Sequence, residues 1–228
     1  MRLPDLGLEV AAWEQGYRLV AGVDEAGRGA WAGPVAAAAV ILPPNRPDLR
    51  RRLDGVRDSK TLSARQRDAL FEIIHGEAVA VGVGMVDPDA IVAGGIMVAT
   101  RQAMAAAIRE LSYRPDFLLI DYLRLPQVDI LQRGVRKGDE RSLSIAAASI
   151  VAKVSRDRLM VEMADALPHY GFERHKGYGT RAHWAAIRIH GATPFHRYTW
   201  APFRRLKAFG RPSLVASSRE RSAERNGS

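Results

Sequence analysis

The sequence predicts an α/β fold in which a mixed β-sheet is flanked by helices. Apolar runs of strand length alternate along the chain with longer segments of helical periodicity, which is the pattern of a sheet covered by helices. Three strands come first in sequence order, and a helix, a further strand and more helices follow, which indicates a mixed sheet. The 228 residues, 47% of them hydrophobic, suffice for one large domain or for a domain with a small appendage.

Four segments have the composition of strands. Residues 18–24 form the first apolar run and residues 35–42 the second. The short connection between them, residues 29–34, predicts that they pair as an antiparallel hairpin. Further strands are expected at residues 78–85 and 117–121, and the latter ends in an acid.

The predicted helices begin and end at recognisable signals. Ser63 and Gln66 form a capping box for a helix that runs to His75, and Gly76 is expected to end it. The other predicted helices are a lead-in helix at 7–16 with Leu8, Ala11 and Ala12 on one face, a helical region at 88–111 interrupted by Gly94 and Gly95, a long helix at 142–167, and a shorter one at 180–190 closed by Gly191.

The chain divides into three parts without internal repeats. Residues 1–17 contain the lead-in helix, and residues 18–206 form the main domain with its C-terminal helical part. Residues 207–228 are rich in Ser, Arg and Glu with few apolar residues, so they are expected to be a disordered basic tail.

Charge and composition narrow the function classes. Lys and Arg number 34 against 25 Asp and Glu, and the net charge of +9 favours a polyanionic partner. The absence of cysteine excludes disulfides, thiolate zinc sites and thiol nucleophiles, and it fits the cytoplasm as the location. No signal peptide is recognised, and the apolar stretches are too short to span a bilayer, so no membrane association is expected. The six histidines lack zinc-type spacing, which favours surface or packing roles for them.

Two adjacent carboxylates, Asp24 and Glu25, stand at the end of the first apolar run. The turn Gly27-Arg28-Gly29 follows at once. Neighbouring carboxylates repel each other and lose hydration when buried, so a fold that keeps them together normally adds a cation or shares a proton. Oxygen ligands suit Mg²⁺ or Mn²⁺, and glycines let a bound ligand approach the backbone. The alternative is a strand that ends in a polar turn with solvated acids.

Further acids occur where they can join this pair. Asp121 also ends an apolar strand, so the carboxylates of Asp24 and Asp121 converge if the two strands are neighbours. Asp139 precedes the long helix and is either a fourth acid of the cluster or a helix-entry acid favoured by the helix dipole. Asp157, inside that helix, is expected to pair with its arginine neighbours, and Ala146–Ala148 is expected to pack in the core.

Several motifs in register resemble the ribonuclease HII family over about residues 15–203. They are Asp24-Glu25-Ala-Gly-Arg-Gly29, Gly33-Pro-Val35, Asp58-Ser-Lys60, Leu119-Ile-Asp121, Lys137-Gly-Asp139, the run from Ser144 to Asp157, and Gly177-Tyr178-Gly179-Thr180. The resemblance implies a ribonuclease-H-like mixed five-stranded sheet flanked by helices, with a C-terminal helical extension. It also implies an endonuclease that hydrolyses the RNA strand of RNA–DNA hybrids and incises 5′ of single ribonucleotides embedded in duplex DNA.

The resemblance assigns roles to particular residues. Asp24, Glu25 and Asp121 are implied as metal ligands, and Asp139 joins them as the fourth catalytic carboxylate. Two divalent ions, Mn²⁺ or Mg²⁺, are implied, with 5′-phosphate and 3′-hydroxyl products. The implied substrate contacts are Gly27, Arg28, Gly29 and Tyr178 as readers of the ribonucleotide 2′-OH, and Lys60 as a phosphate contact. A monomer is expected, and the sequence identifies no protein partner.

Two residues depart from the family pattern. Trp31 stands where many relatives have a smaller residue, and it either packs on its loop or contacts nucleic acid; Tyr122 follows Asp121 where a small residue is common.

Two other functions are compatible with parts of the sequence. Another ribonuclease-H-like nuclease, such as a junction resolvase, would share the carboxylates but would not need the Gly27–Gly29 turn together with Tyr178. A non-catalytic nucleic-acid-binding module would explain the positive charge but not the strand-end acids, which repel phosphate unless metal is present.

Overall fold

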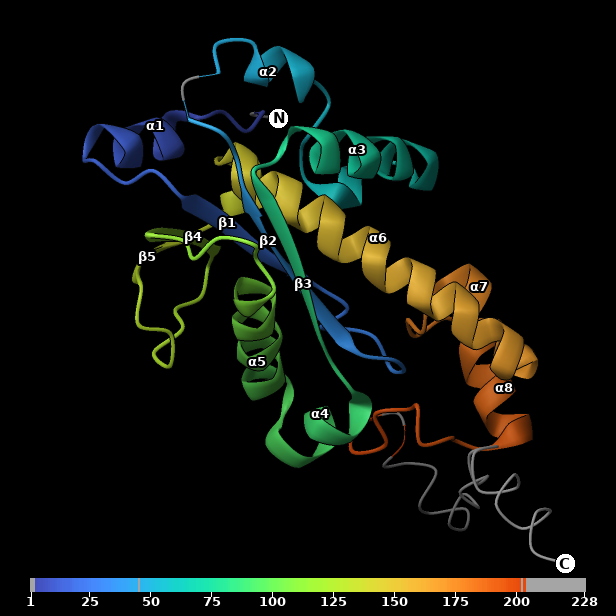
Figure 1. Cartoon of the computed structure of the whole chain (residues 1–228). Coiled ribbons are helices and arrows are strands. Elements are labelled where there is room, and N and C mark those ends of the chain that lie inside the picture. The colour runs from blue at the N-terminus through green and yellow to red at the C-terminus, as the bar shows by residue number, and fades with distance from the viewer. Residues whose placement is uncertain (1–2, 45, 202, 204–228) are drawn as a thin grey trace, which may run out of the picture.

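The computed structural model describes residues 3–44, 46–201 and 203. Its centre is a five-stranded sheet with the strand order β3-β2-β1-β4-β5. Helix α5 (Ile96–Arg109) covers one face of the sheet and helix α6 (Leu143–Ala166) covers the other, which gives three layers (Figure 1). The strands are β1 (Val20–Ala26), β2 (Val35–Ile41), β3 (Ala80–Val86), β4 (Phe117–Asp121) and β5 (Leu131–Val135).

The pairing of the strands confirms the predicted mixed sheet. β1 pairs antiparallel with β2, as the short connection predicted, and β2 pairs antiparallel with β3. β1 is parallel to β4, and β4 is parallel to β5. The strand pattern alone did not locate β5, because this edge strand is largely exposed and its sequence, Leu-Gln-Arg-Gly-Val, is not an apolar run.

Small residues let both helical layers approach the sheet closely. β2 reads Val-Ala-Ala-Ala-Ala-Val-Ile and is buried throughout. A Cβ added at Gly22 would lie 2.2 Å from the carbonyl carbon of Ser144 in α6, and one added at Gly84 would lie 2.3 Å from the carbonyl oxygen of Ala103 in α5. The alanines 146–148 are fully buried between α6 and the sheet, so their predicted packing role is confirmed.

Most predicted helices are present with shifted ends. The structure has α1 (Gly7–Glu14), α2 (Leu49–Arg52), α3 (Ala64–Glu77), α4 (Pro88–Gly94), α7 (Phe172–His175) and α8 (Arg181–His190), besides the 3₁₀ turns η1 (Ser59–Thr61), η2 (Gly138–Glu140) and η3 (Pro168–Tyr170). The capping box of Ser63 and Gln66 and the break at Gly95 are confirmed. The prediction that Gly76 ends α3 is wrong, because Gly76 keeps a helical conformation and the helix continues to Glu77.

The lead-in helix α1 packs on the main domain through part of the predicted face, with Ala12 in a core cluster and Leu8 against it, and it adds a buried acid. Its buried residues are Glu9 and Ala12, whereas Leu8 and Ala11 are only half-buried. The Glu9 carboxylate accepts hydrogen bonds from the Ser142 and Ser144 hydroxyls, both 2.6 Å long, at the start of α6. The periodicity therefore missed a buried acid that joins α1 to α6.

The C-terminal helical part, η3 to α8, packs against the distal end of α6 around its own small core. Within the described residues, no helix is both long enough and apolar enough to cross a membrane. The expected tail at 207–228 and the last residues of the predicted main domain lie outside the described residues.

We expect two glycine-to-alanine substitutions to have opposite effects on the free energy of unfolding. Gly22→Ala places a methyl group within 2.5 Å of three α6 backbone atoms, so α6 must shift. Such overpacking costs about 1–3 kcal/mol. Gly76→Ala meets no atom within 4 Å in a helical position. It should stabilise by about 0.5–1 kcal/mol. Chemical denaturation of both variants measures the difference, and a Gly22→Ala protein as stable as the unsubstituted chain would contradict the close packing.

Candidate active site

The strand-end acids meet at one edge of the sheet. Val23 of β1 is in register with Ile120 of β4, and the two strands are parallel. Asp24 and Asp121, the next residue on each strand, therefore lie side by side, and Glu25 follows within β1. The structure brings these three predicted residues together because parallel neighbours end at the same edge.

Asp139 joins this edge through the 3₁₀ turn η2. The backbone N–H of Gly138 donates to Asp121 Oδ1 at 2.7 Å, which places Asp139 beside Asp121. Asp139 is buried and lies in the turn before α6 begins. Asp58, which the sequence reasoning named only as part of a motif, approaches the cluster from η1, and its negative charge contributes to the raised pKa of Asp139.

The carboxylates raise one another's pKa values. Burial raises the pKa of Asp24 well above its usual range, and the charges of Glu25, Asp121 and Asp139 add to this effect. Burial also raises the pKa of Asp121, with Glu25 as a further cause. For Asp139 the causes are burial and then the charges of Asp58 and Asp121. The cluster thus holds more negative charge than its protein surroundings neutralise.

Lys60 is the cation that lies beside Asp139 in this cluster. Its Nζ lies 3.9 Å from Asp139 Oδ2 and 3.9 Å from Asp58 Oδ1, and its side chain is 83% exposed. Partial burial lowers the pKa of Lys60, but the surrounding carboxylates outweigh that effect and raise it. An exposed ammonium at this distance screens the carboxylates only in part and remains accessible to a phosphate.

Glu25 carries a buried oxygen that has no protein partner. Its Oε1 accepts a hydrogen bond of 3.0 Å from Arg28, whereas its Oε2 is buried without a hydrogen-bond partner among the described residues. An orphaned carboxylate oxygen in an all-oxygen cluster fits a hard divalent cation. No three His, Asp or Glu side chains within the described ranges already stand arranged around a common ion position. The expected metal ligands therefore lie at one edge of the sheet, but the described side chains are not arranged around an ion.

The turn after these acids depends on glycine. Gly27 has a φ of +88°, and its carbonyl accepts from the Ala30 N–H at 3.2 Å. A Cβ at Gly27 would lie 2.0 Å from Nε of Arg156, whereas a Cβ at Gly29 would meet nothing within 4 Å. Gly27 is thus required by the packing of Arg156, and Gly29 is exposed and free to approach a ligand.

Two buried arginines hold the turn in place, and sequence reasoning missed both. Arg156 of α6 donates to the carbonyls of Pro34, Ala32 and Lys176 at 2.8–3.0 Å. Arg197 donates to three backbone carbonyls, those of Arg28, Gly33 and Pro34, at 2.9–3.1 Å. Both side chains are fully buried, and burial, together with the charge of Arg156, lowers the pKa of Arg197 to about 9.

The predicted pairing of Asp157 with its arginine neighbours is wrong. Asp157 instead pairs with Lys153 at 2.6 Å and with Arg67 of α3 at 3.8 Å. Arg156 points toward the sheet because it lies one turn from Ala152 and one turn from Met160, both buried on the same face of α6. That position on an apolar helix face is the signal in the sequence that would have found Arg156.

Tyr178 is brought to the glycine turn by Arg156. The guanidinium carbon of Arg156 and the Nζ of Lys153 each lie 5.3 Å from the centre of the Tyr178 ring. The carbonyl of Gly177 accepts from the backbone N–H groups of Trp31 and Ala32, which ties the tyrosine loop to the segment after the turn. Arg156 therefore lies between the two parts of the expected 2′-OH reader.

Trp31 packs against the C-terminal helical part, which favours a packing role over a contact with nucleic acid. A Cβ added at Gly179 would lie 2.2 Å from the Trp31 ring, and that ring also contacts His183 and Trp184. Tyr122 is different, because it is 68% exposed beside Asp121 and has a positive φ of 56°.

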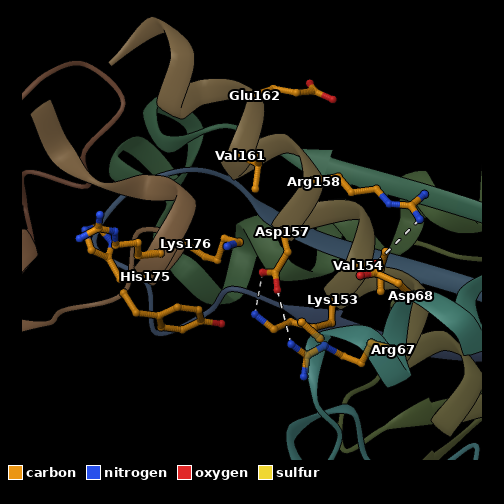
Figure 2. Close-up of a pocket in the computed structure, with 13 residues that line it drawn as sticks. Arg67, Asp68, Lys153, Val154, Asp157, Arg158, Val161, Glu162, His175 and Lys176 are labelled. Carbon is orange, nitrogen blue, oxygen red and sulfur yellow. Dashed lines mark hydrogen bonds and ion pairs between the residues drawn. The ribbon is translucent and has the colours of Figure 1, made fainter. Parts of the chain in front are cut away.

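A groove of about 640 Å³ lies beside Tyr178, between α3, α6 and α7. Figure 2 shows Lys153 and Arg67 pointing toward Asp157, and Arg158 pointing toward Asp68. Arg174 and Lys176 add further positive charge to its lining. The groove begins at the tyrosine loop and follows α6, so it can accommodate a polyanionic chain that continues past Tyr178.

Comparison with known proteins gives a consistent result. The chain matches the family described as Ribonuclease HII over residues 21–203. It is 51% identical over 203 residues to the ribonuclease HII of Chloroflexus aurantiacus, a match that covers 88% of this chain and 94% of that protein.

Solved structures share the fold. Ribonuclease H2 from Pyrococcus horikoshii superposes with a TM-score of 0.70 at 26% identity, covering 83% of this chain and 97% of that one. Ribonuclease HII from Archaeoglobus fulgidus, solved in complex with PCNA, gives 0.65 at 25% identity, covering 80% and 95%. Bst-RNase HIII, solved with Mn²⁺, gives 0.62 at 19% identity, covering 88% and 72%, and shows the fold alone.

These matches extend over the whole region that contains the carboxylates, the glycine turn and Tyr178, and they remove the junction-resolvase alternative. The same matches exclude the alternative that the chain is a non-catalytic nucleic-acid-binding module. The chain belongs to the ribonuclease HII family, nucleases that cleave the RNA strand of RNA–DNA hybrids.

Proposed function

We propose that this nuclease also incises duplex DNA on the 5′ side of a single embedded ribonucleotide, leaving 3′-hydroxyl and 5′-phosphate ends. The observation that carries the proposal is the position of Arg156, which contacts both the Gly27 turn and the Tyr178 ring next to the carboxylate edge. A site that has to recognise one 2′-OH needs its donors and its stacking surface fixed relative to the reacting phosphate.

We infer that Asp24, Glu25 and Asp121, together with Asp139, hold two divalent ions, Mg²⁺ or Mn²⁺. The orphaned Oε2 of Glu25 and the mutually raised pKa values of Asp24, Asp121 and Asp139 support this, as does a protein of the same fold that was solved with Mn²⁺. When bound, such ions would activate water and stabilise the departing 3′ oxygen. Because the described side chains are not arranged around an ion, small side-chain movements must accompany binding.

The chain's own residues would position the substrate. The Tyr178 ring is half-buried above Arg156 and Lys153, and its open side is available to stack on a sugar. The exposed Gly29 lets the sugar edge approach the backbone. Lys60, beside Asp139, would bind a phosphate near the reacting group, and Lys153 and Lys176 in the groove would bind phosphates beyond Tyr178.

A protein partner, the location in the cell and the oligomeric state are proposed from the sequence and the family. The sequence of this chain identifies no protein partner, whereas the Archaeoglobus fulgidus relative forms a complex with PCNA, so a protein partner is compatible with this family. The cytoplasmic location and the monomeric state stay predictions.

Asp24→Asn should abolish cleavage and change stability in opposite directions with and without metal. The folded state raises the pKa of Asp24, so it binds this proton more tightly than the unfolded state does. That stabilisation is present below the unfolded pKa and is lost as pH rises through the folded pKa. At pH 7 in EDTA the variant should therefore melt at a higher temperature than the unsubstituted protein, and saturating Mn²⁺ should reverse the order.

Turnover of Asp24→Asn should fall more than about 100-fold, since changes outside the ligand shell alone cost up to that much. Asp54→Asn, at a carboxylate that is 85% exposed after α2, is the control for a lost surface carboxylate. Substantial activity at saturating metal would contradict the metal assignment.

Asp139→Asn should lose far more turnover than Asp157→Asn. Asp139 faces Asp121 and Asp58 at the sheet edge, whereas Asp157 is occupied by Lys153 and Arg67 in the groove. We expect Asp157→Asn to change KM more than kcat, because it alters the charge of the groove. Steady-state kinetics on an RNA–DNA hybrid compares them, and a larger kcat loss in Asp157→Asn would overturn the choice of Asp139.

Tyr178→Ala should lose more activity on a single embedded ribonucleotide than on a continuous RNA–DNA hybrid, which offers many registers. A deoxyribose or a misplaced sugar leaves buried donors unpaired at about 1–3 kcal/mol each. Tyr178→Phe separates the ring from its hydroxyl, and Tyr113→Ala, an exposed tyrosine near the start of β4, is the control. If the ratio of turnover on the two substrates is unchanged in Tyr178→Ala, the 2′-OH is read elsewhere.

A further inference from the structure

Three histidines of the C-terminal part form one network beneath the Tyr178 loop. His183 and His196 are fully buried, and their Nε2 atoms lie 3.1 Å apart. The His175 ring stacks on His183 with ring centres 4.4 Å apart. The proposed cleavage uses none of these side chains directly. Sequence reasoning expected packing or surface roles for the histidines, with a phosphate contact as the alternative for His175.

The hydrogen bonds of this network run in one direction. The backbone N–H of Thr193 donates to Nδ1 of His196 at 3.1 Å, so His196 carries its proton on Nε2. That Nε2–H donates to Nε2 of His183, whose proton must then be on Nδ1. The Nδ1–H of His183 donates to the backbone carbonyl of Tyr178 at 3.0 Å. One chain of donors thus leads from Thr193 to Tyr178.

His175 holds the backbone of Gly177, the residue before Tyr178, and its tautomer also follows from its hydrogen-bond partners. Its Nε2 lies 2.7 Å from the Tyr170 carbonyl and donates to it, so its Nδ1 is an acceptor. The backbone N–H of Gly177 donates to that Nδ1 at 3.2 Å. Both ring nitrogens are occupied, which leaves His175 no donor for a phosphate.

The network functions only with neutral rings. A second proton on His183 would place its Nε2–H against the Nε2–H of His196, and both groups would be donors. Burial lowers the pKa of His183 to about 4 and that of His196 to about 3. At neutral pH the tautomers are therefore set by fixed partners, and the Tyr178 carbonyl keeps His183 as a second donor beside the Thr180 N–H, which lies 2.9 Å away.

We propose that His183 and His196 are positioning residues for ribonucleotide recognition, because their directional hydrogen bonds fix the backbone of Tyr178 and hold its ring over Arg156. The inference rests on the proposed role of Tyr178 as reader. The competing explanation is that both histidines only fill space, since His183 also packs against the Trp31 and Phe172 rings.

Two substitutions of His183 separate these explanations. In His183→Asn the amide nitrogen takes the place of Nδ1 and can still donate to the Tyr178 carbonyl. In His183→Gln the amide lies where Nε2 was, so more volume is kept but the donor to Tyr178 is lost. If His183 positions Tyr178, the His183→Asn variant should discriminate between the two substrates better than the His183→Gln variant. If His183 only fills space, the order should be reversed.

The readout is the turnover on a single embedded ribonucleotide divided by the turnover on a continuous hybrid. We expect His183→Gln to lower this ratio about 5- to 10-fold, the equivalent of one hydrogen bond, and His183→Asn to lower it less. His190→Gln, at an exposed histidine of α8, should leave it unchanged. Thermal unfolding is measured in parallel, so that equal melting temperatures with different ratios exclude a purely structural effect.

A double variant distinguishes failure of this inference from failure of the proposed function. If Tyr178→Ala changes the ratio, adding His183→Gln should change it no further. If Tyr178→Ala changes the ratio but His183→Gln alone does not, the positioning inference is overturned and the reader stands. If Tyr178→Ala has no effect, the proposed reader itself is wrong.

NMR of the histidine side chains tests the network without any substrate. At neutral pH the ¹⁵N spectrum should show His183 as the Nδ1–H tautomer and His196 and His175 as Nε2–H tautomers. An Nε2–H tautomer at His183, or a charged His196, would overturn the proposal whatever the kinetic result.

Discussion

The arrangement of the site depends on two buried guanidinium groups whose partners, among the described residues, are backbone carbonyls and not carboxylates. Arg156 and Arg197 bind backbone carbonyls from three separate segments, so each buried charge is met by several oxygen dipoles. Burying a charge costs free energy unless it is fully hydrogen-bonded, and an arginine offers five donors in a fixed plane for this purpose. Only the folded backbone supplies acceptors at those positions, so the arginines and the loops they bind fix each other.

Helix α6 links the carboxylate edge of the sheet to the Tyr178 loop. Its first turn packs against Gly22 in β1, next to the strand-end acids, and Arg156 lies three turns farther on, against Gly27. A continuous helix keeps the separation of its residues constant, at about 1.5 Å per residue. The distance between the strand-end carboxylates and the Tyr178 loop is therefore set by a rigid element, and small glycines and alanines let that element lie directly on the sheet.

The carboxylate edge and the region beneath Tyr178 differ in how they hold ionisable groups. At the sheet edge, acids are held together with too little positive charge, which raises their pKa values and prepares them for cations. Beneath Tyr178, burial keeps His183 and His196 neutral, and each of their ring nitrogens has a hydrogen-bond partner. Cation binding would stabilise the carboxylate edge. The histidine network, in contrast, keeps its geometry only while its rings stay uncharged.

The sequence by itself determined the class of sheet, four of its five strands, the main helices and the acids that meet at the sheet edge, because periodicity and strand-end position are local properties. It did not reveal β5, whose residues are exposed at the edge, or the burial of Glu9 in α1. It also paired Asp157 with the wrong arginines. The roles of Arg156, Arg197 and the histidines were decided only by the tertiary structure. Desolvation and the direction of a hydrogen bond are defined only once segments far apart in the chain meet, and no local pattern records which carbonyl a buried donor will find.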